Sequence, residues 1–193
     1  MELTPLGIEG AWLAKSPLWN DDRGHFREWF KREEVLSRTG IDFSVQQANI
    51  SLSKRGVIRG IHYSLAPGGQ AKWITCTSGK IIDVLVDLRP NSSTFKKIEY
   101  IELNNDGARS VLVGPGLGHG FISLKDDTCV SYLLNQPYSP MDECALNPFD
   151  SDLNIDWQLN LILQTEVTMS NKDFSAPNLT TLKSRGKLPQ HEM

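Results

Sequence analysis

The sequence predicts an all-β protein, a β-sandwich or barrel with few and short helices. Most of the chain alternates apolar and polar residues with a period of two, the pattern of strands with one buried face. Turn residues divide these runs into a series of short segments. Only one stretch combines the start and stop features of a helix. Together these three observations favour an all-β class.

Strand candidates follow one another through the middle of the chain. The clearest covers residues 80–89, where apolar residues from Ile82 to Leu88 alternate with Asp83 and Asp87. We expect the two aspartates to lie opposite a single buried face. The other candidates are residues 44–53, 56–65, 71–78, 96–103, 108–114, 119–125 and 128–135.

A helix is expected near residues 31–40, which carry acidic residues early and Gly40 as a C-terminal stop. The segments "TSGK" (77–80) and "KDDT" (125–128) have the composition of tight hairpin turns. We expect the polar tail, about residues 175–193, to wrap the outside or to fray. Without a dividing linker, residues 1–193 are expected to form one domain.

Composition narrows the classes of function. The chain has 193 residues, 39% of them hydrophobic and 22% charged, as in ordinary soluble proteins. A net charge of −3 provides no basic field for non-specific binding of nucleic acid. There is no apolar run of the ~20 residues that a membrane span needs, and no signal peptide is expected. The odd, widely spaced Cys76, Cys129 and Cys144 argue against disulfides or structural zinc and favour the cytoplasm.

Three basic residues lie in or beside strand candidates, in "RGIHYSLAPGGQAK" (59–72). Ionised Arg and Lys are rarely buried unless they are paired, so Arg59 and Lys72 indicate an anionic ligand. His62 would face away from Arg59 on a regular strand, but a bend at Gly60 would bring both side chains into one cavity. Taken alone, His62 is more often a half-buried histidine bonded to a backbone carbonyl.

His119 follows a turn rich in glycine, "GPGLGHGF" (114–121). Two interpretations are open: the glycines only form a loop, or they let the backbone approach a ligand closely. This turn and the segment from Lys72 to Gly79 resemble the motifs of cupins, which are small jelly-roll barrels. Metal-binding cupins carry a glutamate where this chain has Lys72. Imidazoles with an ammonium group are a poor divalent-metal site, so we expect neither metal nor cofactor.

A closer resemblance is carried by six sequence blocks that occur in order between about Asp22 and Asp173. They are "DDRGHFREWF", "QQANISLSKRGVIRGIHYSLAPGGQAKWI", "GKIIDVLVDLRPNSSTF", "GPGLGHGF", "SYLLNQPYSPMDE" and "MSNKD". Together they resemble the dTDP-4-dehydrorhamnose 3,5-epimerase family. The resemblance implies a metal-free cupin-like jelly roll and a homodimer that exchanges N-terminal strands. It also implies a dTDP-linked 4-keto-6-deoxy sugar as substrate, inverted at C3 and C5 through enolate-type intermediates.

The resemblance implies four catalytic roles. His62 would be the general base and Asp173 would orient its imidazole. Lys72 would donate to the developing C4 oxyanion. Tyr132 would return a proton on the opposite face of the sugar, which suits a phenol with a pKa of about 10. Without the resemblance, Asp173 would be interpreted as a turn or cap residue and Tyr132 as a core tyrosine.

The remaining implied roles concern binding. Arg59 would grip the diphosphate with its planar guanidinium, and Tyr138 would stack on the thymine. The other implied substrate-binding residues are Arg23, Phe26, Glu28, Gln47, Asn49, His119, Phe121, Glu143 and Lys172. For Arg23 and Glu28 the alternative is an ordinary surface ion pair.

One departure from the family is the bulky Trp73 after Lys72, although alternation should point it away from Lys72 into the core. Two other functions stay open. One is epimerisation at C3 alone or C5 alone, on a dTDP- or other nucleotide-linked 4-keto sugar. The other is a cupin-like sugar-binding module without turnover.

Overall fold

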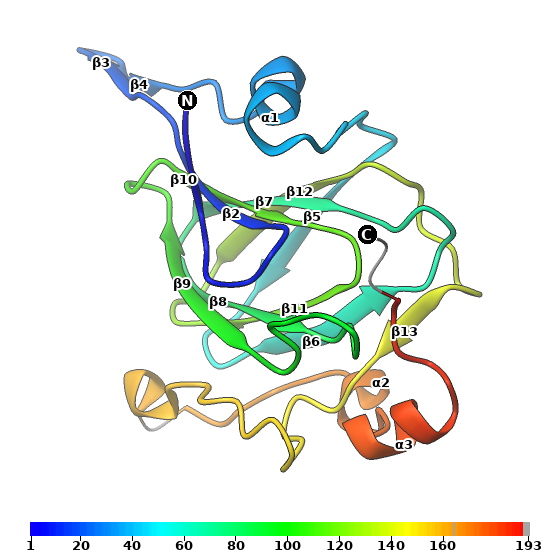
Figure 1. Ribbon diagram of the computed structural model, residues 1–193. Helices are drawn as coiled ribbons and strands as arrows, with labels where there is room; N and C mark the ends of the chain where they lie inside the picture. The colour runs from blue at the N-terminus through cyan, green and yellow to red at the C-terminus, as the bar shows by residue number, and fades with distance from the viewer. Residues whose placement is uncertain (164, 191–193) are drawn as a thin grey trace.

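Two antiparallel sheets face each other in the computed structural model, which describes residues 1–163 and 165–190 (Figure 1). Within this part of the chain, the six-stranded sheet has the order β1 (Glu2–Pro5), β2 (Ala11–Lys15), β10 (Arg109–Val113), β7 (Lys72–Ser78), β12 (Thr128–Leu134) and β5 (Gln47–Ser53). The five-stranded sheet has the order β13 (Glu143–Ala145), β6 (Ile58–Ser64), β11 (Leu117–Ser123), β8 (Lys80–Asp87) and β9 (Ile98–Asn104). The small hairpin of β3 (Trp19–Asp21) and β4 (Gly24–Phe26) projects from the body. The predicted all-β class is confirmed.

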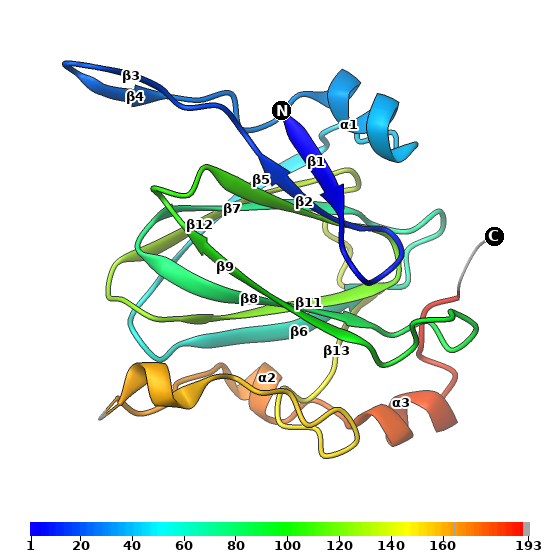
Figure 2. The ribbon, with the colours of Figure 1, turned by 60° about the vertical axis from the view of Figure 1, so that its left-hand side comes forward.

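Short helices cover the outer faces of the two sheets (Figure 2). Helix α1 (Arg32–Thr39) lies over the six-stranded sheet and ends at Gly40, whose left-handed φ of 74° permits the stop. Helices α2 (Asn171–Phe174) and α3 (Leu179–Ser184) lie on the other side, below the five-stranded sheet, and the 3₁₀ turn η1 (Leu159–Ile162) precedes them. The predicted helix at residues 31–40 is thus confirmed.

The two predicted hairpin turns connect different sheets, so that prediction is wrong. The turn at Gly79 joins β7 of one sheet to β8 of the other, and residues 125–128 join β11 to β12 in the same way. Gly79 has a φ of +77°, and a Cβ atom there would collide with Thr128. Turn chemistry marks a tight reversal, but it does not determine whether the flanking strands pair with each other.

Strand β8 is buried on both faces, contrary to the single buried face that its alternation predicted. Its outward apolar residues, such as Val84 and Val86, pack against the C-terminal segment. Its inward face carries Leu85 toward the other sheet, and by alternation Asp83 and Asp87 point the same way. Both aspartates are fully buried. The alternating polar residues of β8 therefore lie in the lumen of the barrel and do not face solvent.

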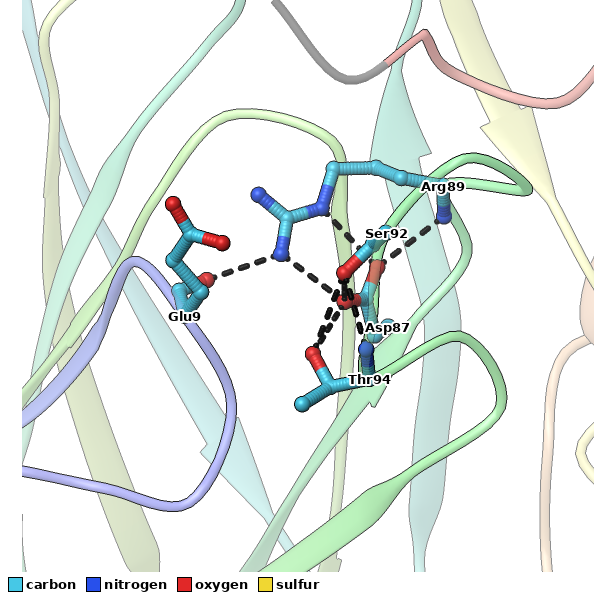
Figure 3. A network of polar contacts seen from close by, with 5 residues as sticks. All are labelled: Glu9, Asp87, Arg89, Ser92 and Thr94. Carbon is cyan, nitrogen blue, oxygen red and sulfur yellow. Dashed lines mark hydrogen bonds and ion pairs between the residues drawn. The ribbon is translucent and has the colours of Figure 1, made fainter. Parts of the chain in front are cut away.

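The buried carboxylate of Asp87 is held by a network at the end of β8 (Figure 3). Arg89 pairs with it at 2.8 Å, and the hydroxyl groups of Ser92 and Thr94 donate to it at 2.6 and 2.7 Å. Arg89 also donates to the backbone carbonyl of Glu9 at 2.8 Å, which ties the N-terminal turn to this end of the barrel. Burial raises the pKa of Asp87, but the donated hydrogen bonds outweigh burial and leave this pKa below its ordinary value.

The C-terminal segment packs against the body up to residue 190. Leu179, Leu182 and Leu188 are buried in the cluster that covers the outer face of β8, and Tyr63 donates to the carbonyl of Lys187 at 2.7 Å. The tail lies outside the sheets, as expected, but these described residues pack against the body and are not frayed. Residues 191–193 of the predicted tail lie outside the described residues.

Candidate functional site

A cavity of about 490 Å³ lies between the two sheets. Strands β5, β7 and β12 line it from one sheet, β6 and β11 line it from the other, and residues 168–173 close one side. This volume is in the range of small-molecule sites. Most of the predicted site residues line this cavity: Asn49, Arg59, His62, Lys72, His119, Phe121, Tyr132, Tyr138, Glu143, Lys172 and Asp173.

The strand bends at Gly60, as the sequence allowed. Its φ is 110°, and the register of β6 against β11 shifts between His119 and Phe121. As a result Arg59 and His62 line the same cavity, although they would lie on opposite faces of a regular strand. The structure thus contains the bend that glycine permits at this position, the condition under which the two side chains were expected to share a cavity.

His62 and Asp173 form a hydrogen-bonded pair, with 2.6 Å between Nε2 and Oδ1. His62 and Asp173 are 111 positions apart in the chain. They meet because α2 begins beside β6, where the backbone N–H of Ile58 donates to the carbonyl of Thr168 at 2.9 Å. Ser170 caps α2 by accepting from the backbone N–H of Asp173 at 3.1 Å. Asp173 is therefore a helix residue of the first turn whose carboxylate is aimed at an imidazole.

Asp173 is a buried residue, 3% exposed. Burial raises its pKa, but the hydrogen bond and charge of His62, with further bonds from Ser170 and the Gly60 backbone, lower it below its ordinary value. An anion held in this way can fix the orientation of the ring and stabilise an imidazolium.

Lys72 is a buried amine at the inner wall of the cavity. Its Nζ donates to the carbonyl oxygen of His62 at 3.4 Å. Burial lowers the pKa of Lys72, and the nearby carboxylates of Glu143 and Asp83 act against that shift. Trp73 points the other way, into the cluster beneath α1, as alternation predicted.

Tyr132 faces the cavity from β12, the sheet opposite to that of His62. Burial raises the pKa of its phenol, and Glu143 adds to this, while a hydrogen bond from Asn49 and the charge of Arg59 act in the other direction. The phenol is therefore protonated at neutral pH. The cavity thus has an imidazole on one wall and a neutral phenol on the other.

A second histidine–aspartate pair lies beside the first. His119 is the cross-strand partner of His62, and its Nε2 lies 2.7 Å from Oδ1 of Asp83. Sequence reasoning did not find Asp83 because its strand was expected to have a polar outer face. Asp83 lies two residues before the buried Leu85, so both side chains are on the same face of the strand. This spacing was the signal that could have identified Asp83.

Four predicted site residues do not line the cavity of their own chain. Arg23 and Phe26 lie on the projecting β3–β4 hairpin, and Arg23 pairs with Asp21. Glu28 pairs with Lys31 at the surface. For Arg23 and Glu28 the single chain thus agrees with the surface ion-pair alternative.

Gln47 is the fourth of these residues, and it lies behind residues that line the cavity. Its side chain contacts Asn49 and the backbone of Tyr138, both of which line the cavity.

Other cavity residues were missed by sequence reasoning. Ser51 lies on the same face of β5 as Asn49, so the period of two could have identified it. Ser170 and Met169 precede α2, and their position depends on how this segment returns to β6. Gln70 is buried in the wall with no local signal.

Among the described residues, no three His, Cys, Asp or Glu side chains gather where they could hold a metal ion. Likewise, none of the helices in the described part of the chain is long and apolar enough to cross a membrane.

The fold is a cupin-like jelly roll, and comparison with known proteins identifies the chain as an isomerase and gives its family. Residues 5–181 match the family model described as dTDP-4-dehydrorhamnose 3,5-epimerase. The chain belongs to this family. The predicted family and jelly-roll fold are thereby confirmed.

Similar proteins extend over nearly the whole chain. A dTDP-4-dehydrorhamnose 3,5-epimerase of Streptomyces griseus is 40% identical over 98% of this chain and 92% of its own length. The solved structure of an epimerase of Mycobacterium tuberculosis is 35% identical with a TM-score of 0.94, covering 98% of this chain and 94% of that one. A 3′-monoepimerase of Streptomyces bikiniensis in complex with dTDP-quinovose is 40% identical with a TM-score of 0.90, covering 96% and 92%.

Proposed function

We propose that this protein epimerises a dTDP-linked 4-keto-6-deoxy sugar at C3 and C5. The observation that supports this most directly is that His62 and Tyr132 line one cavity from opposite sheets. Inversion of a carbon centre needs a proton removed from one face and another delivered to the opposite face. A base and an acid on facing walls meet this requirement.

In the proposed reaction, His62 removes the proton from a carbon next to the C4 ketone, and Asp173 stabilises the resulting imidazolium. The electrons move onto the ketone oxygen, where Lys72 donates a hydrogen bond to the developing enolate. Tyr132 then delivers a proton to the other face of the carbon. We propose that the enzyme needs no metal or other cofactor, because the chain's own groups carry each step.

The nucleotide would occupy the more exposed part of the cavity. Arg59 is exposed, and Ser53 and the Leu52 carbonyl hold its guanidinium at 3.1 Å, so the group is oriented to meet a diphosphate. Lys172 adds positive charge, and the exposed ring of Tyr138 is available to stack on the base. The other cavity residues with proposed contacts to the substrate are Asn49, His119, Phe121 and Glu143.

We propose a homodimer in which the β3–β4 hairpin enters the cavity of the second copy. In the single chain β1 pairs with β2, so this hairpin is the N-terminal element left to exchange. The side chain of Phe26 is 65% exposed, and on the edge strand β5 Ile50 and Leu52 are 75% and 63% exposed. These apolar groups favour burial against another chain. Arg23, Phe26 and Glu28 would then act on the partner's substrate. The proposed location is the cytoplasm, where the free cysteines would stay reduced.

Epimerisation at C3 alone is a second candidate. It is favoured by the 40% identity to the 3′-monoepimerase, which is as high as the identity to the 3,5-epimerase.

Incubation with dTDP-4-keto-6-deoxyglucose in D₂O, followed by proton NMR, tests the proposal. We expect deuterium at both C3 and C5, because both carbons flank the ketone. Label at C3 only would select the second candidate. No label at all would refute epimerisation of this sugar.

The variant His62→Ala serves as the control for the base. Its deuterium incorporation should fall about 10²- to 10⁴-fold while dTDP binding persists, because a general base is lost and the binding groups remain. Unchanged incorporation would remove His62 from this role.

A further inference from the structure

A chain of polar contacts runs along the cavity wall from a backbone amide to the phenol of Tyr132. The backbone N–H of Tyr138 donates to Oε1 of Gln47 at 2.8 Å. Nε2 of Gln47 donates to Oδ1 of Asn49 at 2.9 Å. Asn49 is the cross-strand partner of Tyr132, both side chains line the cavity, and the amide of Asn49 acts to lower the pKa of the phenol. Four groups on β5, β12 and the following loop are thus connected in series.

The direction of this chain is fixed at its backbone end. A backbone N–H can only donate, so the oxygen of Gln47 faces Tyr138 and its NH₂ group faces Asn49. The oxygen of Asn49 is turned toward that donor, so the NH₂ group is the part of the amide left to face the phenol. The hydrogen bond from Asn49 acts to lower the pKa of Tyr132, as expected for a donor to the phenol oxygen.

This direction has a consequence for proton delivery. A phenol has one hydrogen, and an oxygen that accepts from Asn49 keeps that hydrogen for another acceptor. Tyr132 lines the cavity, so a bound substrate can serve as that acceptor. After proton transfer, the NH₂ group of Asn49 also stabilises the phenolate that forms.

We propose that Gln47 is a positioning residue that keeps the amide of Asn49 turned so that Tyr132 donates its proton to the substrate. Gln47 acts through Asn49 and need not touch the reacting carbons. The proposal rests on the proposed epimerase function, in which Tyr132 is the acid.

The decisive variant is Gln47→Glu, which has the same size and can still accept from Tyr138. The carboxylate cannot donate to Asn49, so the NH₂ group of Asn49 must turn toward it. The oxygen of Asn49 then faces Tyr132 and takes the phenol hydrogen. Gln47→Met removes both polar contacts and leaves Asn49 free to adopt either orientation.

The measurement is the ratio of solvent deuterium exchange to net inversion with dTDP-4-keto-6-deoxyglucose in D₂O. Exchange needs only His62, whereas inversion also needs Tyr132. We expect Gln47→Glu to raise this ratio about tenfold or more, with Gln47→Met between it and the wild type. Tyr132→Phe defines the upper limit. A ratio within twofold of the wild type in Gln47→Glu would overturn the proposal, as would exchange and inversion falling together with a raised KM.

The neighbouring Gln46 provides a matched control. It is exposed and its side chain reaches only Ser44, at 3.4 Å, so Gln46→Glu and Gln46→Met should keep the wild-type ratio. A change in these variants as large as that at Gln47 would assign the effect to general disturbance of β5 and overturn the proposal.

A second readout needs no substrate. Tyrosine ionisation is followed by ultraviolet absorbance against pH, with Tyr132→Phe subtracted. Gln47→Glu should raise the midpoint of Tyr132 by about 1 pH unit, because the phenolate loses a donor and gains a nearby negative charge. An unchanged midpoint would refute the relay. If the wild type neither exchanges nor inverts the sugar but this midpoint moves, the proposed function fails and the relay stands.

Discussion

Within the cavity, single residues have defined partners that limit what each can do. Asp173 is bonded to His62 through its carboxylate and to Ser170 through its backbone N–H, so the carboxylate is held against one imidazole. Lys72 reaches the His62 carbonyl from a buried position in the cavity wall. Such constraint is expected where catalytic geometry must be held before substrate arrives.

The variant Asp173→Asn should lower kcat about 10²- to 10⁴-fold with little change in the affinity for dTDP. The amide keeps the shape of the carboxylate but lacks the charge that stabilises the imidazolium. Steady-state kinetics and calorimetric titration with dTDP measure the two quantities. The exposed Asp152 offers Asp152→Asn as a matched control with wild-type kcat. Equal loss of kcat and of dTDP affinity in Asp173→Asn would contradict an orienting role.

At the scale of elements, β8 connects the site to the stability of the barrel. Asp83 near its middle orients His119, while Asp87 at its end anchors Arg89 and two hydroxyl groups. Both carboxylates lie in the lumen because α3 and the segment before it cover the outer face. The C-terminal layer, distant in sequence, buries the apolar outer face of β8. The polar face of this strand therefore lies in the lumen, where it is available for chemistry.

The variant Asp87→Asn should lower the free energy of unfolding at pH 7 by about 3 kcal/mol, because Arg89 is left buried without its counter-charge. The pKa of Asp87 lies below its ordinary 3.8 in the fold, so its charge stabilises fully above about pH 5. This contribution is lost as the pH falls through the folded pKa. Urea titrations between pH 7 and 3 should show the difference from wild type shrinking with acid. A difference that stays constant would contradict the assignment.

On the scale of the whole molecule, the cavity is lined by two sheets, while the β3–β4 hairpin extends away from both (Figure 2). The hairpin carries Arg23 and the exposed ring of Phe26. A small hairpin with exposed aromatic groups gains little stability alone, and docking on a second copy would bury it. The proposed dimer would thus complete each site from two chains.

Mixing two inactive variants tests this arrangement. His62→Ala lacks the base, and Arg23→Ala/Phe26→Ala lacks the hairpin contacts. After dissociation and reassociation, half of the dimers are mixed and each has one intact site, so activity should return to about a quarter of wild type. Light scattering gives the size of the assembly. A mixture no more active than its components, or a monomer by scattering, would contradict the exchange.

Much of this molecule could be predicted from local sequence. Strands β5 to β12 lie close to the predicted segments, whereas β1 to β4 and β13 were not predicted. Helix α1 stops at Gly40, and the bend at Gly60 brings Arg59 and His62 together. Each of these features depends on residues near one another, through side-chain alternation or the conformational freedom of glycine. The roles assigned to His62 and Tyr132 came from family motifs and stay predictions.

The sequence by itself determined the period of the strands, the helix stop and the types of group gathered around Arg59 and Lys72. Only the tertiary structure decided that the turn at Gly79 crosses between sheets, that Asp83 faces the lumen and that Asp173 meets His62. The physical reason is the distance along the chain over which each kind of interaction acts. Alternation and turn chemistry act over a few residues, whereas the choice of covering layer and partner is made by contacts between segments far apart in the chain.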